Sequence, residues 1–167
     1  MRIPAGKLYF WAVIVAGTIA AAWLLAGATG RTDLAAKFWS DTFVVFLVLG
    51  FVTEAITVPL PKGGRLTAGF SILFACLLEL GIEPTVAMLS VSTLVGGTLI
   101  VKRPLTMCLF NLAQYTLSYL AAYGVLAAGH FALGQAVRSQ YWLIFLAVVA
   151  YLATNIVLVD EIGRAHV

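Results

Sequence analysis

Charged side chains are scarce in this chain of 167 residues, where Asp, Glu, Lys and Arg make up only 10% of the composition. Soluble domains carry about 25%. The apolar fraction is 62% and the mean hydropathy is +1.03, whereas soluble domains are roughly 45–50% apolar. A water-soluble fold could not hide this much apolar surface, so the composition predicts an integral membrane protein.

Residues that usually carry chemistry are also few, with two cysteines and two histidines. Cys76 and Cys108 both lie within apolar segments, which favours buried small hydrophobes over a disulfide or a metal pair. The sequence has no metal-ligand spacing of His, Cys and carboxylates, no serine beside a plausible base, and no phosphate-binding glycine-rich turn. We therefore expect no catalytic residue, metal or cofactor in this chain, and no nucleic-acid partner, because its basic residues only separate apolar segments.

Six long apolar segments are what the chain does contain. They span residues 8–28, 38–60, 66–80, 84–101, 105–129 and 141–159. A helix needs roughly 20 apolar residues to cross a bilayer core of about 30 Å. Strands are disfavoured, because period-two alternation is absent and sheet edges are not tolerated in lipid. The sequence therefore predicts an all-α, polytopic bundle of about six transmembrane helices, with the lipid bilayer as its first partner.

The nature of the first segment and the connection between the third and fourth segments can also be predicted. The first segment ends in Ala26-Gly27-Ala28, which is compatible with a signal-peptide cleavage site, but it is longer than the 7–15 apolar residues of such peptides, which favours a membrane span. The third and fourth segments are separated only by Gly81, Ile82 and Glu83, which predicts a tight helical hairpin with Pro84 in the first turn of the returning helix.

The distribution of Lys and Arg predicts the orientation. A cytoplasmic N-terminus places six of them inside, namely Arg2, Lys7, Lys62, Arg65, Lys102 and Arg103. The outer set is then Arg31, Lys37 and Arg138. The positive-inside rule favours this arrangement, and six spans return the C-terminus to the cytoplasm.

The last residues, Ile162-Gly163-Arg164-Ala165-His166-Val167, differ in character from everything before them. The codons ATC-GGA-AGA-GCA-CAC-GTC encode them and match a widely used sequencing adapter. We therefore interpret residues 1–160 as a transmembrane, sensor-like helical domain and 161–167 as a non-native tail, and expect the natural gene to continue. A short natural polar tail is the alternative.

Polar side chains inside the segments are the candidate site residues, because they are costly in lipid and usually face an interior or a cavity. Glu54 is either a proton or cation site or an interfacial carboxylate reaching toward Lys62, Arg65 or Arg103. Asn111, Gln114, Tyr115 and Ser118 follow helical spacing and share one face. They line a ligand cavity or join helices through hydrogen bonds of about 0.6 kcal/mol each.

Asn155 shares a face with Tyr151 on the last segment and is placed to meet that stripe. The candidate ligand-binding set is therefore Glu54, Asn111, Gln114, Ser118 and Asn155, for a small molecule that the sequence does not identify.

Several short motifs resemble the membrane-associated sensor (MASE-type) N-terminal regions of bacterial cyclic-di-GMP signalling proteins. They are Glu54 with Val58-Pro59-Leu60-Pro61-Lys62-Gly63-Gly64, the Arg103-Pro104 turn, Phe110-Asn111 with Gln114 and Ser118, and Asn155 with Leu158-Val159. The resemblance covers most of residues 54–159. It implies a multi-pass sensory or anchoring module in the bacterial inner membrane, joined to a cytoplasmic HD-GYP or GGDEF output domain that this chain lacks, and it is compatible with a homodimer.

Two other classes remain open from the sequence. Six-helix substrate-binding S-components of vitamin uptake transporters have similar size and hydropathy, and Ala16-Gly17-Thr18-Ile19-Ala20 would suit their contact with a partner subunit. A small structural membrane protein without a ligand is the other.

Overall fold

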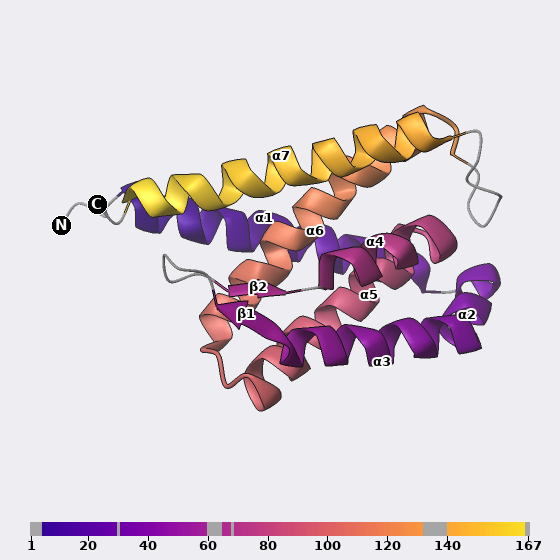
Figure 1. The fold of residues 1–167 in the computed structure, drawn as a ribbon, viewed down its shortest axis with the longest axis horizontal. Helices are drawn as coiled ribbons and strands as arrows, with labels where there is room; N and C mark the ends of the chain where they lie inside the picture. Colours follow the sequence, from indigo (N-terminus) through magenta and orange to yellow (C-terminus); the bar gives the residue numbers. More distant parts are fainter. Residues whose placement is uncertain (1–4, 30, 60–64, 68, 132–139, 166–167) are drawn as a thin grey trace.

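The computed structural model describes residues 5–29, 31–59, 65–67, 69–131 and 140–165, without the side chains of 5, 54, 55, 57–59, 65–67 and 160–165. Helices dominate these residues (Figure 1). The predicted helical class is therefore confirmed.

The first segment forms one long helix, α1 (Ala5–Ala28). The second does not form one helix from 38 to 60 as predicted. Its helix, α3 (Asp41–Ala55), is shorter than predicted at both ends. A separate short helix, α2 (Thr32–Phe38), precedes it, and the two helices are bent by 52° relative to each other. Ser40 causes the break, because its Oγ accepts a hydrogen bond from the Phe43 N–H at 3.2 Å and so caps a new helix.

A short β-hairpin follows α3, which differs from the all-helical prediction. Strands β1 (Thr57–Pro59) and β2 (Arg65–Thr67) pair antiparallel, with Val58 opposite Leu66. Once Pro59 prevents continuation of the helix, the backbone groups here still need partners, and a neighbouring extended segment supplies them. The predicted turn at Lys62, Gly63 and Gly64 lies outside the described residues.

The third and fourth segments form the predicted hairpin. Helix α4 (Gly69–Leu80) ends at Gly81, whose φ of 96° and ψ of −174° redirect the chain into α5 (Ile82–Val91). Lys37 Nζ donates to the Leu80 carbonyl oxygen at 2.8 Å and caps the end of α4. The helix continues from α5 as a π-helix, η1 (Ser92–Ile100). Nine residues is long for a π-helix, a form found mostly as single turns.

The centre of the bundle is α6 (Leu105–Ala128), which contacts α1, α4, α5, η1 and the last helix, α7 (Tyr141–Ala165). Helices α6 and α7 are antiparallel neighbours (Figure 1). Helices α1 and α6 cross at Gly17, where a Cβ would overlap the backbone of Ala113. The absence of a side chain at Gly17 therefore sets how closely these helices approach.

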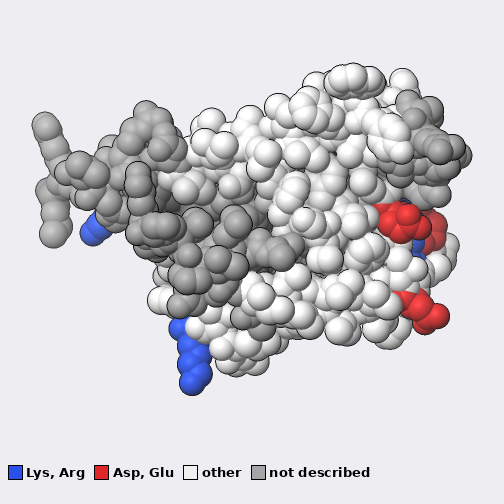
Figure 2. Space-filling view, in the orientation of Figure 1, with Lys and Arg blue, Asp and Glu red and all other residues white. Residues whose placement is uncertain are grey.

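Opposite charges gather at opposite ends of the bundle (Figure 2). One end holds the start of α1, the hairpin and the η1–α6 connection, with Lys7, Lys102 and Arg103 among its described side chains; we call it the basic end. The other holds the α1–α2 and α4–α5 turns, with Asp33, Asp41, Glu79 and Glu83; we call it the acidic end.

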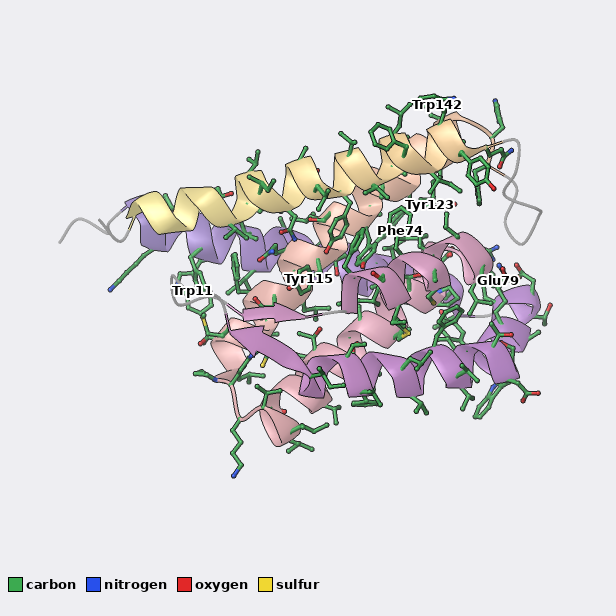
Figure 3. The ribbon with its side chains drawn as sticks, in the orientation of Figure 1. Trp11, Phe74, Glu79, Tyr115, Tyr123 and Trp142 are labelled. Atoms are coloured by element: carbon green, nitrogen blue, oxygen red, sulfur yellow. The ribbon has the colours of Figure 1, made fainter. Side chains whose placement is uncertain are left out.

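The surface between the two ends is strongly apolar. Trp23, Leu99, Phe145, Ile156 and Val157 are all more than half exposed. Trp39 and Trp142 are over four-fifths exposed near the acidic end, and Figure 3 shows Trp142 on the outer side of α7. Aromatic side chains favour the headgroup level of a membrane, so this surface is suited to contact with lipid.

Three helical stretches are long and apolar enough to cross a membrane, namely Gly6–Ala28, Ile82–Ile100 and Tyr141–Val159, and the bent α2–α3 pair adds a fourth. Helix α4 is apolar but has only 12 residues. Helix α6 has 24 residues, yet Asn111, Gln114 and three tyrosines reduce its apolar character. The structure thus supports three to four spans and does not confirm the predicted six.

Candidate functional site

The side chains predicted to bind a ligand fall largely in a polar layer between two hydrophobic clusters. One cluster, toward the basic end, contains Val13, Ile14, Phe110 and Ala113. The other, toward the acidic end, includes Ala21, Leu24, Tyr119, Leu126 and Tyr151. Along α1 and α7, the residues between the two clusters include Thr18 and Asn155. We call this region of α1, α6 and α7 the polar layer.

Helix α6 contributes Gln114 and Ser118, which are 4% and 0% exposed, while Asn111 and Tyr115 are partly buried. The Ser118 hydroxyl donates to the Gln114 carbonyl oxygen at 2.9 Å, within its own helix. Ser118 therefore already has a hydrogen-bond partner, whereas the Gln114 side chain brings an amide into the protein interior.

Asn155 on α7 lies at the level of this stripe. The rings of Tyr151 on α7 and Tyr119 on α6 are 4.7 Å apart. Because α6 and α7 are antiparallel, a residue one turn after Tyr151 lies level with a residue one turn before Tyr119. Asn155 therefore lies level with Tyr115. Figure 3 shows Tyr115 on the inner side of α7. Asn155 Nδ2 is buried and has no hydrogen-bond partner among the described residues.

Three threonines that were not predicted as site residues also have a buried polar atom without a hydrogen-bond partner among the described residues. Thr18 on α1, Thr93 on η1 and Thr116 on α6 each bury a hydroxyl that makes no hydrogen bond to any described group. Unsatisfied buried polar groups are uncommon and cost about 1–3 kcal/mol each. In the sequence these threonines are visible only as hydroxyl residues inside apolar segments. Such residues do not by themselves indicate a site, because Ser and Thr usually donate to a carbonyl oxygen of their own helix, as Ser118 and Ser90 do here.

The tyrosines beside the polar layer, Tyr119 and Tyr151, contact Phe70 of α4. Tyr119 Oη donates to the Phe70 carbonyl oxygen at 3.2 Å, and the Phe70 and Tyr151 rings lie 4.7 Å apart. These contacts tie the first turn of α4 to α6 and α7, so movement of α7 at this level must also involve α4.

Glu54 is not part of the layer as the structure describes it. It lies in the last turn of α3, whose main neighbours are α4, α5 and η1, whereas the other four candidates lie on α6 and α7. The Glu54 side chain lies outside the described residues. The sequence-predicted set therefore divides into four residues of one helix pair and one residue elsewhere.

The profile of the MASE9 family of membrane-associated sensor domains matches residues 31–162, from the start of α2 into the last turn of α7. This match covers most of the chain. The chain belongs to the MASE9 family. No curated protein and no solved structure is significantly similar to it.

The match confirms the resemblance to membrane-associated sensor regions and includes every motif quoted for it, from Glu54 to Val159. It gives no support to the transporter-subunit alternative. Gly17, which precedes the matched residues, packs against Ala113 of α6 within this chain and so is not left free for a partner subunit.

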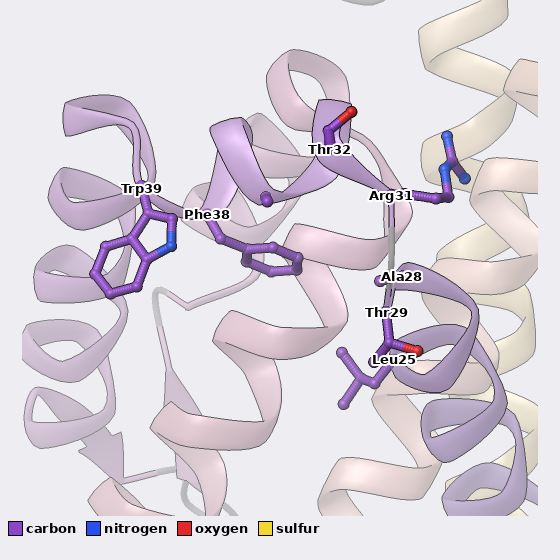
Figure 4. A pocket seen from close by; sticks show the side chains of 8 residues that line it. Leu25, Ala28, Thr29, Arg31, Thr32, Phe38 and Trp39 are labelled. Atoms are coloured by element: carbon purple, nitrogen blue, oxygen red, sulfur yellow. The ribbon is translucent and has the colours of Figure 1, made fainter.

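A second feature of the structure is a groove of about 510 Å³ at the acidic end, between the last turn of α1 and one face of α2 (Figure 4). Leu25, Ala28, Ala35 and Phe38 give it an apolar floor and walls, and Trp39 lies at its edge. We call it the outer groove.

The Arg31 guanidinium extends away from Phe38 and the outer groove (Figure 4). It lies 2.9 Å from Asp33 Oδ2 and 3.5 Å from Glu83 Oε1. The hydrogen bond with Asp33 raises the pKa of Arg31 above its ordinary value. Arg31 is among the residues that line the groove, and its guanidinium also links the α1–α2 turn to α5.

In the described part of the chain, no three His, Cys, Asp or Glu side chains group together. Cys76 and Cys108 do not form a disulfide and are fully buried in the core. Their burial agrees with the predicted role as small hydrophobic residues.

Proposed function

We propose that this chain is the membrane-embedded sensory and anchoring part of a bacterial signal-transduction protein, with an HD-GYP phosphodiesterase or GGDEF cyclase as cytoplasmic output. Membership in a membrane-associated sensor family is the observation that supports this proposal most directly. The output domain follows from the resemblance of the Glu54, Asn111 and Asn155 motifs to such proteins. The chain itself would act as a sensor and anchor, without catalysis.

The topology that we propose has six crossings: α1, α3, α4, α5 with η1, α6 and α7. Helix α6 qualifies by length, since 24 residues rise about 36 Å at 1.5 Å per residue. Helix α4 rises only about 18 Å, and local thinning of the bilayer would accommodate so short a span. Successive crossings run in opposite directions, and the start of α1 and the end of α7 lie at the same end (Figure 1).

The inner (cytoplasmic) membrane orientation that we propose places the basic end inside. Lys7, Lys102, Arg103 and the strand residue Arg65 lie there, against Arg31 and Lys37 at the acidic end. Positive charge is retained on the cytoplasmic side, so both termini would be cytoplasmic. Helix α7 would then lead directly toward the output domain.

In this mechanism the polar layer is the two-state element. A ligand, or a change in the membrane, that favours one packing of α7 on α6 and α1 raises the population of that packing. The activity of the output domain then changes only as far as the ligand binds one packing more tightly than the other. Asn111, Gln114, Ser118 and Asn155 are the proposed ligand-contacting residues, with Glu54 as a separate candidate. The unpartnered Asn155 amide and the Thr18 hydroxyl favour a polar, hydrogen-bonding ligand or bound water.

The test uses the natural full-length protein in its host and measures cellular cyclic-di-GMP. Asn155→Leu is expected to change the cyclic-di-GMP level by roughly fivefold or more, the effect of about 1 kcal/mol of coupling. Ile156→Leu on the same helix is the matched control, because Ile156 is 62% exposed on the surface of the bundle.

Two outcomes would contradict the proposal. The first is a stop codon directly after α7 in the source gene, because no output domain would then exist. The second is an unchanged cyclic-di-GMP level in Asn155→Leu at equal protein abundance.

A further inference from the structure

The helices of this bundle fall into two layers of different length, with α7 and α3 on opposite sides of the bundle (Figure 1). Helices α1, α6 and α7 contact one another, and we call them the long layer. The apolar stretches of α1 and α7, Gly6–Ala28 and Tyr141–Val159, contain 23 and 19 residues and rise about 34 Å and about 28 Å.

Helices α3, α4 and α5 with η1 also contact one another, and we call them the short layer. In this layer α3 and α4 contain 15 and 12 residues and rise only about 22 Å and about 18 Å. The third helix of the layer is shortened by its own geometry, because Ser92–Ile100 form the π-helix η1. A π-helix holds more residues in each turn than an α-helix and therefore rises less per residue.

Both ends of the short layer carry groups that are costly in hydrocarbon. Asp41 begins α3 at the acidic end, and the neighbouring helix α2 carries Asp33 and Lys37. At the basic end, the β1–β2 hairpin follows α3. In the described part of the chain this sheet has two strands, so each strand has one edge without a strand partner. Open sheet edges are not tolerated in lipid, so the hydrocarbon core beside α3 is limited to about 22 Å.

The long layer fits a typical bilayer, whose hydrocarbon core is about 30 Å thick, whereas the short layer fits a thinner one. A short span is accommodated by local thinning of the bilayer, and a helix that is too long is accommodated by tilting. Bilayers of different thickness therefore favour different tilts of the long layer against the short layer.

The two layers meet at the aromatic contact beside the polar layer. Phe70, in the first turn of α4, accepts a hydrogen bond from Tyr119 Oη at 3.2 Å through its carbonyl oxygen, and its ring lies 4.7 Å from that of Tyr151 on α7. Asn155 follows Tyr151 by one turn of α7. A change in the tilt of the long layer against α4 therefore acts at the level of the polar layer.

We propose that the stimulus of this sensor is the hydrophobic thickness of the bilayer. A thin bilayer fits the short layer and makes α1, α6 and α7 tilt, whereas a thick bilayer lets them stand upright and is itself thinned beside α3. The contact of Tyr151 with Phe70 transmits this change of angle to the polar layer. The inference rests on the proposed function, because it names the stimulus of that same sensor.

The experiment measures the distance between two spin labels in the purified protein by double electron–electron resonance. Trp39→Cys and Trp142→Cys place one label at the acidic end of each layer, at positions that are over four-fifths exposed, whereas Cys76 and Cys108 are fully buried and should not react. The protein is placed in phosphatidylcholine bilayers with hydrocarbon cores of roughly 22 to 33 Å. We expect the mean distance to change by roughly 5 Å or more across this range, because α7 changes its tilt.

Trp23→Cys with Trp142→Cys is the matched control, because Trp23 is 73% exposed on α1 and both labels then lie on the long layer. The distance between these labels should stay constant, since α1 and α7 tilt together. A constant distance between positions 39 and 142 at every thickness would overturn the proposal, and so would an equal change in the control pair. The proposed function would survive either result, because the Asn155→Leu test does not vary the bilayer.

A second test changes the height of the short layer. Asp41→Leu removes the carboxylate that limits α3 at the acidic end and extends its apolar surface, so the change in distance should move to bilayers thicker by about 2–5 Å. Asp41→Asn is the matched control, because its amide keeps this end polar, and it should respond like the unchanged protein. The same response in Asp41→Leu and Asp41→Asn would contradict a response that is set by the height of the short layer.

Discussion

At the scale of single residues, this chain contains two kinds of buried polar group. In the first kind, the hydroxyl donates a hydrogen bond to a carbonyl oxygen of its own helix, as in Ser118, Ser90 and Thr85. Thr18, Thr93, Thr116 and Asn155 keep buried polar atoms without a partner in the described part of the protein. The first kind contributes to stability, whereas the second costs stability unless water or a ligand satisfies it.

This difference predicts opposite effects of two nearly isosteric changes on α6. Thr116→Val removes an unpaired hydroxyl, so the free energy of unfolding should stay the same or rise by up to about 1 kcal/mol. Ser118→Ala removes a hydrogen bond and should lower it by about 0.5–1.5 kcal/mol. Reversible unfolding in mixed micelles would measure both, and a loss of stability in Thr116→Val would show that its hydroxyl has a partner.

A second residue-scale prediction concerns the crossing of α1 and α6. Gly17→Ala should lower the free energy of unfolding by about 1–3 kcal/mol, because the new Cβ overlaps the Ala113 backbone and forces the helices apart. Gly27→Ala on the same helix is the control, since nothing lies within 4 Å of its Cβ position. Alanine there should be neutral or stabilising by up to about 1 kcal/mol. Equal effects of the two changes would argue against close contact at Gly17.

At the scale of secondary-structure elements, the connections differ from the sequence prediction more than the helices do. Long apolar segments predicted α1, α6 and α7 closely, because apolar length alone decides whether a helix forms in lipid. The segment 38–60 was predicted as one helix beginning at Phe38, because the apolar residues begin there. Hydropathy does not register a local side-chain cap, and the Ser40 cap makes α3 begin only at Asp41 and separates it from α2.

The α4–α5 connection yields an element-scale prediction. Gly81 has a φ of 96° and a ψ of −174°, a region that is essentially restricted to glycine. Gly81→Ala should therefore lower the free energy of unfolding by about 1–3 kcal/mol, while Gly124→Ala on α6, with open space around its Cβ position, should not. Chemical unfolding followed by circular dichroism at 222 nm would compare them, and an unaffected Gly81→Ala protein would mean that the turn adopts another conformation.

At the scale of the whole molecule, sequence reasoning recovered the class of protein but only part of the site. Composition was enough for a helical membrane protein, and the spacing of Asn111, Gln114 and Ser118 placed a polar stripe on α6. The pairing of that stripe with Asn155 depends on how α6 and α7 align, which was only suggested by their shared aromatic faces. The outer groove could not be foreseen, because it arises from the 52° bend and from the approach of α2 to α1.

Orientation is the whole-molecule property that can be tested most directly, by cysteine labelling in intact cells. The unchanged protein is its own control, because Cys76 and Cys108 are fully buried and should not react. Trp39→Cys, at the exposed α2–α3 corner, should react with a membrane-impermeant maleimide added outside. Lys102→Cys, in the connection between η1 and α6 at the opposite end, should react only after the membrane is permeabilised.

This expectation follows from the proposed orientation, in which the Lys and Arg side chains of the basic end stay in the cytoplasm because their translocation is avoided. The alternating direction of the helices then requires Trp39 and Lys102 to face opposite compartments whenever the bundle crosses the membrane as proposed. Labelling of both cysteines from the same side would mean that the elements between them make an even number of crossings. The short helix α4 would then be the segment that enters the membrane and returns without crossing it.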